Sequence, residues 1–395
     1  MPTDLPHVGL LLLIAALVTI LSRRLRVPYA IGLVLAGLAI GWLDVPLQLT
    51  LSKELVFGLF LPPLVFEAAL QIHWPELRRD LPLIGLLATL GVLLAATLTA
   101  LGMAWLAGWS LPSALVFGTL IAATDPVSVI ATFKDAGVTG RLRLLIEAES
   151  LLNDGTAAVG VAIAVAYAAG ASSGALAIGL ALGRSIGGGV LCGLGAGALL
   201  LLARRAREPL VEITLTTAAA YGSFWLAEHY HLSGILAALA AGLVAGNSKS
   251  IRRSGDTGRA VIESYWQYVA FAANSMIFLL MGGHAARAMP TLWRPALIAI
   301  VLVTAGRAVA IYPLCALWSG SAQRVEIRHQ HVLFWGGLRG ALALALALGL
   351  PPELAYREAI VTTTFAVVIW SILAQGLSIT PLMRRLGLLG PREAP

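Results

Sequence analysis

Residues 119–128 read TLIAATDPVS and lie near the middle of a mainly apolar block, residues 111–133. Pro126 has no amide hydrogen, and it disfavours helical geometry at Asp125. A helix that crosses a membrane here should therefore break near its middle and leave backbone carbonyls unpaired. Such a break is tolerated at that depth only where it lines a protein-buried or water-filled cavity. A proline kink repaired by neighbouring helices is the alternative.

The composition of the whole chain indicates a membrane protein. The 395 residues are 58% hydrophobic and 12% charged, and the mean hydropathy is +0.86. These values exclude a soluble enzyme, a disordered protein and a nucleic-acid binder, so membrane lipid is the expected surrounding and no nucleic acid is expected as a partner. Apolar blocks of about twenty residues predict an all-α polytopic fold. We place thirteen spans at residues 7–22, 28–43, 50–71, 82–107, 111–133, 142–168, 175–203, 209–228, 232–247, 260–283, 294–318, 330–349 and 356–382.

The loops between these spans differ in charge from one side to the other. Twenty Lys and Arg residues fall on one side and four on the other. The positive-inside rule then predicts an N-terminus outside and a C-terminus in the cytoplasm. The first residues lack a basic segment and a small-residue cleavage site, so the first block is expected to be retained. We expect one transmembrane domain over 1–395 with no soluble C-terminal domain. The excess of Arg over Lys, with abundant Ala, Gly and Leu, leans towards a GC-rich bacterial genome, and the expected location is a bacterial inner membrane.

Polar residues concentrate in the span at 142–168. Ser150 and Asp154 are four residues apart and share one helix face, as do Glu149 and Asn153. Asp154 falls near mid-membrane, where an unpaired carboxylate stays protonated until a cation approaches, because the ionised form is costly to bury. A site where a proton and a metal ion exclude one another is the minimum machinery of an antiporter. A structural ion pair is the alternative, and it suits Glu149 better than Asp154.

Two arginines inside spans supply counter-charge. Arg307 lies in the middle of the span at 294–318, and Arg339 lies in the glycine-rich stretch 336–340 (GGLRG) of the next span. Glycines let the backbone leave helical geometry, so this span and the one at 111–133 are predicted to be paired broken helices. Asp125 would neutralise the half-helix N-termini where they cross, and Arg339 the C-termini. Loss of either side chain should therefore remove folding or transport.

Glu67, in the span at 50–71, is a further intramembrane acid. It lies near the cytoplasmic end, so snorkelling or a loop partner is a fair alternative to a functional role. The two cysteines, Cys192 and Cys315, lie in separate apolar stretches and are expected to be core packing, with no metal framework.

Four motifs together resemble one family. Residues 61–68 (LPPLVFEA), 123–126 (ATDP), 149–155 (ESLLNDG) and 336–341 (GGLRGA) are similar, in order and in span, to motifs of the monovalent cation:proton antiporters of the sodium/proton exchanger group, NhaP-like in bacteria. The likeness extends over essentially the whole chain.

The resemblance implies a homodimer whose protomers contain two six-span inverted repeats. A moving core bundle would comprise residues 82–168 and 294–382, and a dimerisation scaffold would comprise residues 7–71 and 175–283. The core would move against the scaffold to give alternating access. No cofactor is implied, since Na+ and H+ are the transported substrates.

The resemblance also implies roles for single residues. The cation ligands would be Asp154 as the essential carboxylate, Ser150 through its hydroxyl, Thr124 through its backbone carbonyl, and Glu67, with water in between. Na+ would thus sit at Asp154, Ser150 and Thr124.

Three further residues would support that site. Asn153 would brace the broken helix at 111–133, and Glu149 would pair with Arg307. An electrogenic branch of the family has two adjacent aspartates where this chain has Asn153 and Asp154. The single titrating carboxylate therefore implies electroneutral exchange.

Other functions remain open at this point. K+ or Li+ could replace Na+, because selectivity depends on cavity size and ligand number, which a sequence does not display. A passive cation channel would need a continuous polar stripe, and none is evident. An intramembrane enzyme is disfavoured because no Ser/His constellation and no paired catalytic carboxylates occur within the spans.

Overall fold

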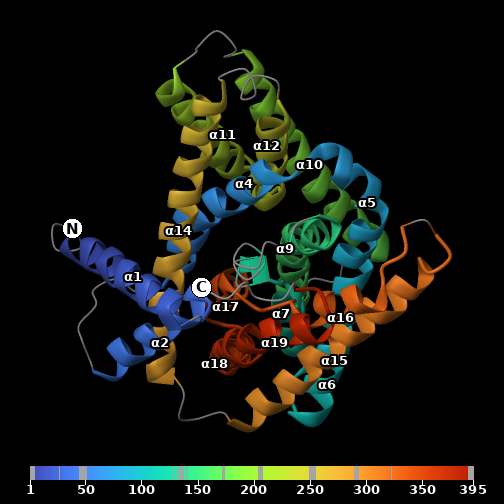
Figure 1. Ribbon diagram of the computed structural model, residues 1–395. Coiled ribbons are helices and arrows are strands. Elements are labelled where there is room, and N and C mark those ends of the chain that lie inside the picture. The colour runs from blue at the N-terminus through green and yellow to red at the C-terminus, as the bar shows by residue number, and fades with distance from the viewer. Residues whose placement is uncertain are drawn as a thin grey trace.

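The computed structural model describes residues 5–25, 27–43, 51–127, 129–130, 133, 138, 140–170, 174–202, 208–248, 255–288, 293–321 and 323–389. Ser128 and parts of the basic loops, at 203–207 and 249–254, lie outside these ranges. Within them the chain is helical, with one isolated β-bridge (Figure 1).

The first half of the chain contains α1 (Leu5–Leu25), α2 (Tyr29–Trp42), α3 (Lys53–Leu55), the π-helix η1 (Val56–Phe60), α4 (Leu61–Gln71), α5 (Trp74–Leu86), the π-helix η2 (Leu87–Gly91), α6 (Val92–Leu106), α7 (Leu111–Ala122), α9 (Arg141–Ala168) and α10 (Ala175–Leu202). The second half contains α11 (Pro209–His229), α12 (Gly234–Asn247), α14 (Gly255–Ala288), α15 (Trp293–Leu317), α16 (Ile327–Trp335), α17 (Ala341–Leu348), α18 (Arg357–Trp370), the π-helix η3 (Ser371–Gln375) and α19 (Gly376–Arg385).

Among the residues that the structure describes, eight helical runs are long and apolar enough to cross a membrane, which confirms the predicted all-helical polytopic fold. They are Val8–Leu25, Lys53–Gln71, Trp74–Leu106, Arg141–Ala168, Gly179–Leu200, Arg259–Ala286, Trp293–Leu317 and Arg357–Arg385. The described part of the chain also contains three shorter apolar helices, at Tyr29–Trp42, Leu111–Ala122 and Gly234–Asn247.

One helix begins earlier than its apolar block predicts. The run α5–η2–α6 starts at Trp74, whereas the sequence places the span at 82–107 and assigns Arg78 and Arg79 to a loop. Pro75 stands in the first helical turn, and Leu77 and Asp80 are buried while both arginines are exposed. The first two turns are therefore amphipathic, and a hydropathy criterion excludes them.

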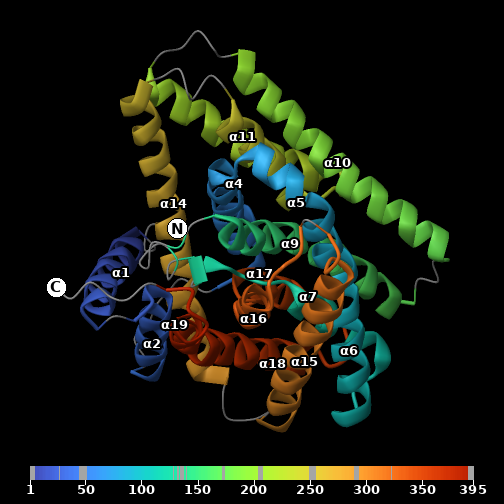
Figure 2. The same cartoon turned by 45° about the vertical axis from the view of Figure 1, so that its right-hand side comes forward.

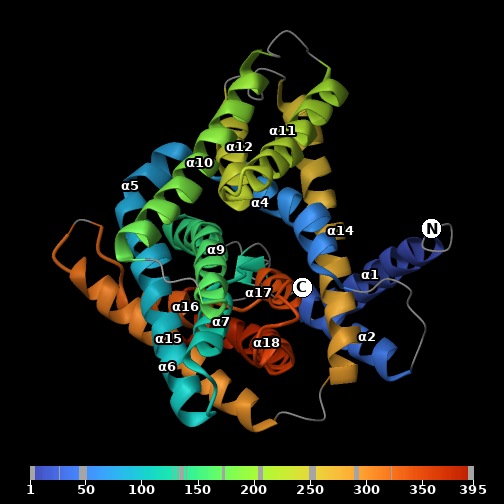
Figure 3. The ribbon, with the colours of Figure 1, turned by 180° about the vertical axis from the view of Figure 1, so that it is seen from behind.

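The helices form two groups in space (Figures 1–3). In the first, α4, α11, α12 and α14 pack together, α10 runs along their outside, and α1 and α2 lie against one end of α14. The rings of Phe66 on α4 and Trp266 on α14 are 4.5 Å apart in a buried cluster shared with α11 and α12. In the second group, α5, α6, α7 and α9 pack with α15 to α19.

Close backbone contact joins α2 to α14. A Cβ atom on Gly37 would lie 2.2 Å from the carbonyl oxygen of Leu279, and one on Gly282 would lie 2.3 Å from that of Val34. Only glycine permits this approach, which is typical of small-residue interfaces between membrane helices. The two helices are therefore held in direct backbone contact.

Two helices are broken where the sequence predicts a break. The helix α7 ends at Ala122, and residues 123–126 are extended. The helices α16 and α17 are separated by residues 336–340. The two extended stretches meet in an antiparallel bridge between Asp125 and Leu338, which places both breaks at one point inside the second group of helices.

Candidate functional site

Arg339 neutralises the end of α7. Its Nη1 donates to the carbonyl oxygens of Ala122 and Ala123, at 2.8 and 3.1 Å. These carbonyls have no intrahelical partner, because the helix stops here, and they form the negative pole of the helix. The Arg339 amide donates in turn to the Ser371 hydroxyl of η3 at 3.0 Å. A buried cation and a buried helix end thus satisfy one another.

Asp125 lies on the opposite side of the crossing, the point where the two helix breaks meet at the Asp125–Leu338 bridge. Its Oδ1 accepts from the Val127 amide at 2.9 Å, and its carboxylate lies close to the backbone of Ala341 at the start of α17. A Cβ atom on Gly340 would lie 2.1 Å from the Asp125 Oδ2, so glycine is required for this close approach. The carboxylate therefore faces helix N-termini, where negative charge is stabilised.

A buried polar network ties the extended segment to α9. The Thr124 amide donates to the Asn153 Oδ1 at 3.1 Å, and the Asn153 Nδ2 donates to the Thr124 Oγ1 at 2.6 Å. The Ser150 hydroxyl donates to the Thr124 carbonyl. Thr124, Ser150 and Asn153 are all at most 3% exposed. The backbone of the break is thereby held against the face of α9 that carries Asp154.

Asp154 borders a cavity of about 1370 Å³. The carboxylate is half-buried, and its Oδ1 is enclosed without a hydrogen-bond partner among the described residues. No salt bridge joins it to an arginine within the part of the chain that the structure describes. A buried carboxylate oxygen without a donor is rare in proteins, and a carboxylate of this kind at membrane depth marks a candidate functional site.

The same cavity exposes two other polar groups of the predicted site. Thr124 and Asp125 line it beside Asp154, whereas Ser150 and Asn153 lie behind the wall and are not part of the lining. The cavity also reaches Arg23 and Arg384, which lie next to basic loops. Its mouth therefore lies on the side where the basic residues gather.

Glu149 and Arg307 form a two-pronged ion pair. The Arg307 Nη1 and Nη2 donate to the two Glu149 carboxylate oxygens at 2.7 and 2.9 Å, and Nη2 also donates to the carbonyl of Leu333 at 3.1 Å. Glu149 is 1% exposed and also accepts from the Asn153 Nδ2 at 3.0 Å. This pair joins α9, α15 and α16 behind the crossing, away from the cavity.

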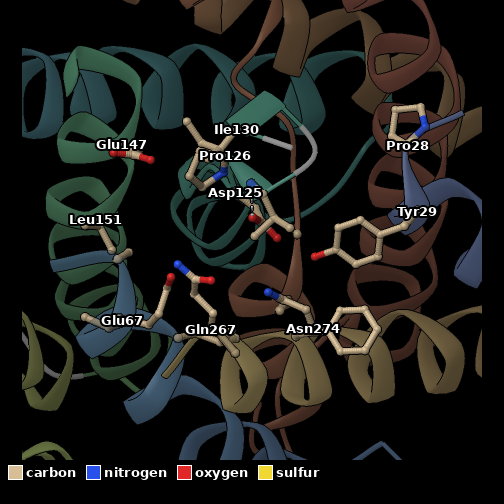
Figure 4. A pocket seen from close by; sticks show the side chains of 18 of the residues that line it. Pro28, Tyr29, Glu67, Asp125, Pro126, Ile130, Glu147, Leu151, Gln267 and Asn274 are labelled. Atoms are coloured by element: carbon tan, nitrogen blue, oxygen red, sulfur yellow. Dashed lines mark hydrogen bonds between the residues drawn. The ribbon is translucent and has the colours of Figure 1, made fainter. Parts of the chain in front are cut away.

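Glu67 reaches the cavity from the other group of helices. It lies on α4 and points into the same space as Gln267 of α14 (Figure 4). Leu151 of α9 lies next to Glu67, and Glu147 lies one turn earlier on α9. Tyr29 of α2 extends its hydroxyl towards Asp125 from the far side. The Gln71 side chain donates to the Glu67 carboxylate. The structure thus brings Glu67 to the same cavity as Asp154.

The sequence interpretation missed several groups around this cavity. Tyr29, Gln267 and Asn274 line it, although they occur in spans with no recognisable motif. Gln71 is four residues after Glu67 on α4, a spacing that could have indicated a contact. Arg143, at the edge of the span predicted at 142–168, lies in the first turn of α9 and donates to Gln71 at 3.0 Å.

The fold and the site define a polytopic membrane protein in which two broken helices cross beside a carboxylate that lines a cavity of about 1370 Å³. This arrangement is typical of ion-coupled secondary transporters. A family model described as "Sodium/hydrogen exchanger, transmembrane" matches residues 11–385. The chain belongs to that family.

Individual relatives agree with this assignment. The chain is 37% identical to the Na(+)/H(+) antiporter ApNhaP of Aphanothece halophytica, over 96% of this chain and 73% of the relative. It is 33% identical to the Na(+)/H(+) antiporter NhaH of Halobacillus dabanensis, over 96% and 97%. The solved structure of the sodium proton antiporter MjNhaP1 from Methanocaldococcus jannaschii superposes with a TM-score of 0.77 at 20% identity, over 98% of this chain and 99% of that one. This last similarity concerns the fold.

Proposed function

We propose that this protein is a secondary active transporter that exchanges Na+ for H+, and that it is not an enzyme. The observation that carries the proposal is the Asp154 carboxylate, which borders the cavity with an enclosed Oδ1 that no described group satisfies. Its relatives, named as Na(+)/H(+) antiporters over nearly the whole of this chain, support the same substrates.

Competition for one carboxylate provides the coupling. A proton on Asp154 removes the charge that a cation needs, and a bound cation removes the need for the proton. We assign the Na+ ligands to the Asp154 carboxylate, the Ser150 hydroxyl and the Thr124 carbonyl, with Glu67 acting through water. Support comes from the Ser150 hydroxyl, which already lies against the Thr124 carbonyl. One titrating carboxylate per Na+ makes the exchange electroneutral.

The supporting residues have a separate task. Asn153 braces the break in front of α9, the Glu149–Arg307 pair holds that helix against α15, and Asp125 and Arg339 neutralise the crossing. The hydrogen bonds of Asn153 to Thr124 and of Arg339 to the end of α7 support this division. No resident cofactor takes part in it.

The proposed architecture has thirteen spans in two inverted six-span repeats. The core at 82–168 and 294–382 moves against the scaffold at 7–71 and 175–283, and two protomers join through the scaffold. The separation of the helices into two groups supports this division (Figure 3). We place the protein in a bacterial inner membrane with the N-terminus outside and the C-terminus in the cytoplasm. The cavity would then open to the cytoplasm, since Arg23 and Arg384 line it.

Purified protein in vesicles with a trapped pH dye tests the function. Addition of Na+ should move protons in the opposite direction, and an imposed membrane potential should not change the rate. Parallel runs with K+ and Li+ identify the preferred cation. A response to the potential would contradict the one-carboxylate stoichiometry, and cation flux without proton movement would indicate a channel.

The variant Asp154→Asn tests the site in the same vesicles. It keeps the shape of the side chain but cannot exchange a proton for a cation, so exchange should disappear while expression and folding remain. Glu263→Gln is the matched control, because Glu263 is a half-exposed acid on α14 that pairs with Arg259 away from the cavity. Substantial exchange by Asp154→Asn would overturn the assignment of the site.

A further inference from the structure

Four polar side chains form a continuous chain from α4 to α9 beside the cavity. The Gln71 Nε2 donates to the Glu67 carboxylate, and the Gln71 Oε1 accepts from the Arg143 Nη2 at 3.0 Å. The Arg143 Nε in turn donates to the Glu147 Oε1 at 3.0 Å. Glu67, Gln71 and Glu147 all line the cavity. This row of hydrogen-bonded side chains therefore runs anion, amide, cation and anion along the cavity wall.

The amide of Gln71 suits its two neighbours. An amide offers a donor at one end and an acceptor at the other, so it can bridge a carboxylate and a guanidinium at the same time. Both of its hydrogen bonds involve a charged partner, and such bonds are about twice as strong as neutral ones. Arg143 thereby determines which end of the amide faces Glu67. The orientation of the Glu67 carboxylate depends on a residue of a different helix.

The link also depends on the relative position of the two helix groups. Glu67 and Gln71 lie on α4, which packs with α12 and α14, whereas Arg143 and Glu147 lie on α9, which carries Asp154. A donor–acceptor distance beyond about 3.5 Å is no longer a hydrogen bond. A displacement of α9 by a fraction of a helical turn would therefore break the contact between Arg143 and Gln71.

We propose that Gln71 and Arg143 form a latch that stabilises the cavity-open arrangement and orients Glu67 in that arrangement. The inference rests on the proposed function, because it takes α9 to move relative to α4 during exchange. The latch releases when α9 moves, and Glu67 then loses its fixed orientation. Gln71 and Arg143 are in this sense positioning residues, and Glu67 is the group through which they act.

The first test is a double-mutant cycle on Na+-driven exchange, with Na+ added on the side to which the cavity opens. Gln71→Ala, Arg143→Ala and the double variant should each raise the apparent KM for Na+ by about tenfold, the effect of one charge-assisted hydrogen bond. The maximal rate should fall far less. Arg259→Ala is the matched control, since it removes an Arg–Glu pair at the same four-residue spacing but on α14, where Arg259 has no hydrogen bond to another helix among the described residues.

The second test measures cavity opening without transport. Ser264 lines the cavity, so Ser264→Cys, in a background with Cys192→Ala and Cys315→Ala, reports its accessibility to a membrane-impermeant thiol reagent. Gln71→Ala and Arg143→Ala should each slow the labelling, and Arg143→Lys should restore part of it, because a lysine can still donate to the amide.

Two results would overturn the latch. One is a double variant whose KM rises by the product of the single effects, about a hundredfold, since independent sites multiply their effects. The other is labelling and KM values that stay at those of the parent protein. Failure of the proposed function looks different: the parent protein would move no protons on Na+ addition, while the labelling experiment would still report on the latch.

Discussion

The Asp125 amide donates a 2.7 Å hydrogen bond to the carbonyl of Leu338, so a backbone hydrogen bond joins the two helix breaks. The residues next to this bond carry the neutralising charges, Asp125 itself and Arg339. A single backbone bridge therefore aligns the half-helix ends and the two side chains that stabilise them. The crossing places the Thr124 carbonyl against Ser150 of α9.

Gly340→Ala should abolish exchange, because its Cβ would lie 2.1 Å from the Asp125 Oδ2 and 2.3 Å from the Asp125 Cβ. The extended segment must move away from α17 to accommodate it. Initial exchange rates in vesicles measure the effect. Gly222→Ala on α11 is the control, since a Cβ there would meet no atom of another described element within 4 Å, and it should leave the rate unchanged. Normal exchange by Gly340→Ala would show that the crossing tolerates a displaced Asp125.

Arg339→Ala and Asp125→Ala should each lose folding or transport, because each leaves a buried helix pole without its counter-charge. Arg339→Lys should be less damaging than Arg339→Ala, since an ammonium can still donate to the Ala122 or Ala123 carbonyl. Yield of monodisperse protein in detergent and the exchange rate are the two measurements. Parent-like transport by both alanine variants would remove the role assigned to these residues.

Arg307→Ala should lower the melting temperature in detergent, because it leaves the Glu149 carboxylate buried without a cation. Loss of one partner from a buried ion pair costs about 3–5 kcal/mol. Arg259→Ala, which breaks the half-exposed pair with Glu263, should cost about 0.5 kcal/mol. Equal shifts in the two variants would mean that the buried pair adds nothing beyond an exposed one.

The apparent KM for Na+ should rise as the pH on the cavity side falls. A lower pH places a proton on Asp154 in more of the molecules, and the cation must displace it. In the range where the protonated form dominates, mass action predicts a rise of about tenfold per pH unit at a constant maximal rate. Rates measured over a matrix of Na+ concentrations and pH values provide the check. A falling maximal rate at constant KM would place the proton elsewhere.

The local pattern of the sequence was sufficient to predict an all-helical polytopic protein and its two broken helices. Apolar length, Pro126 and the glycines at 336–340 act within a few residues of themselves, so a single chain without relatives displays them. Hydropathy predicts the start of this span at residue 82, eight residues after α5 begins at Trp74, because the first turns of α5 are amphipathic and bury only Leu77 and Asp80. Hydropathy reports lipid contact rather than helix formation.

The order of residues alone is enough to place the carboxylates and arginines of the site at membrane depth, because each is a charge within an apolar block. Which of the charged groups pair with one another depends on how the helices pack in the folded protein. This packing pairs Glu149 with Arg307, sets Arg339 on the end of α7, and leaves the Asp154 Oδ1 without a partner among the described residues at the cavity. These outcomes depend on distances of about 3 Å between helices that are far apart in the chain, and no local pattern contains such distances.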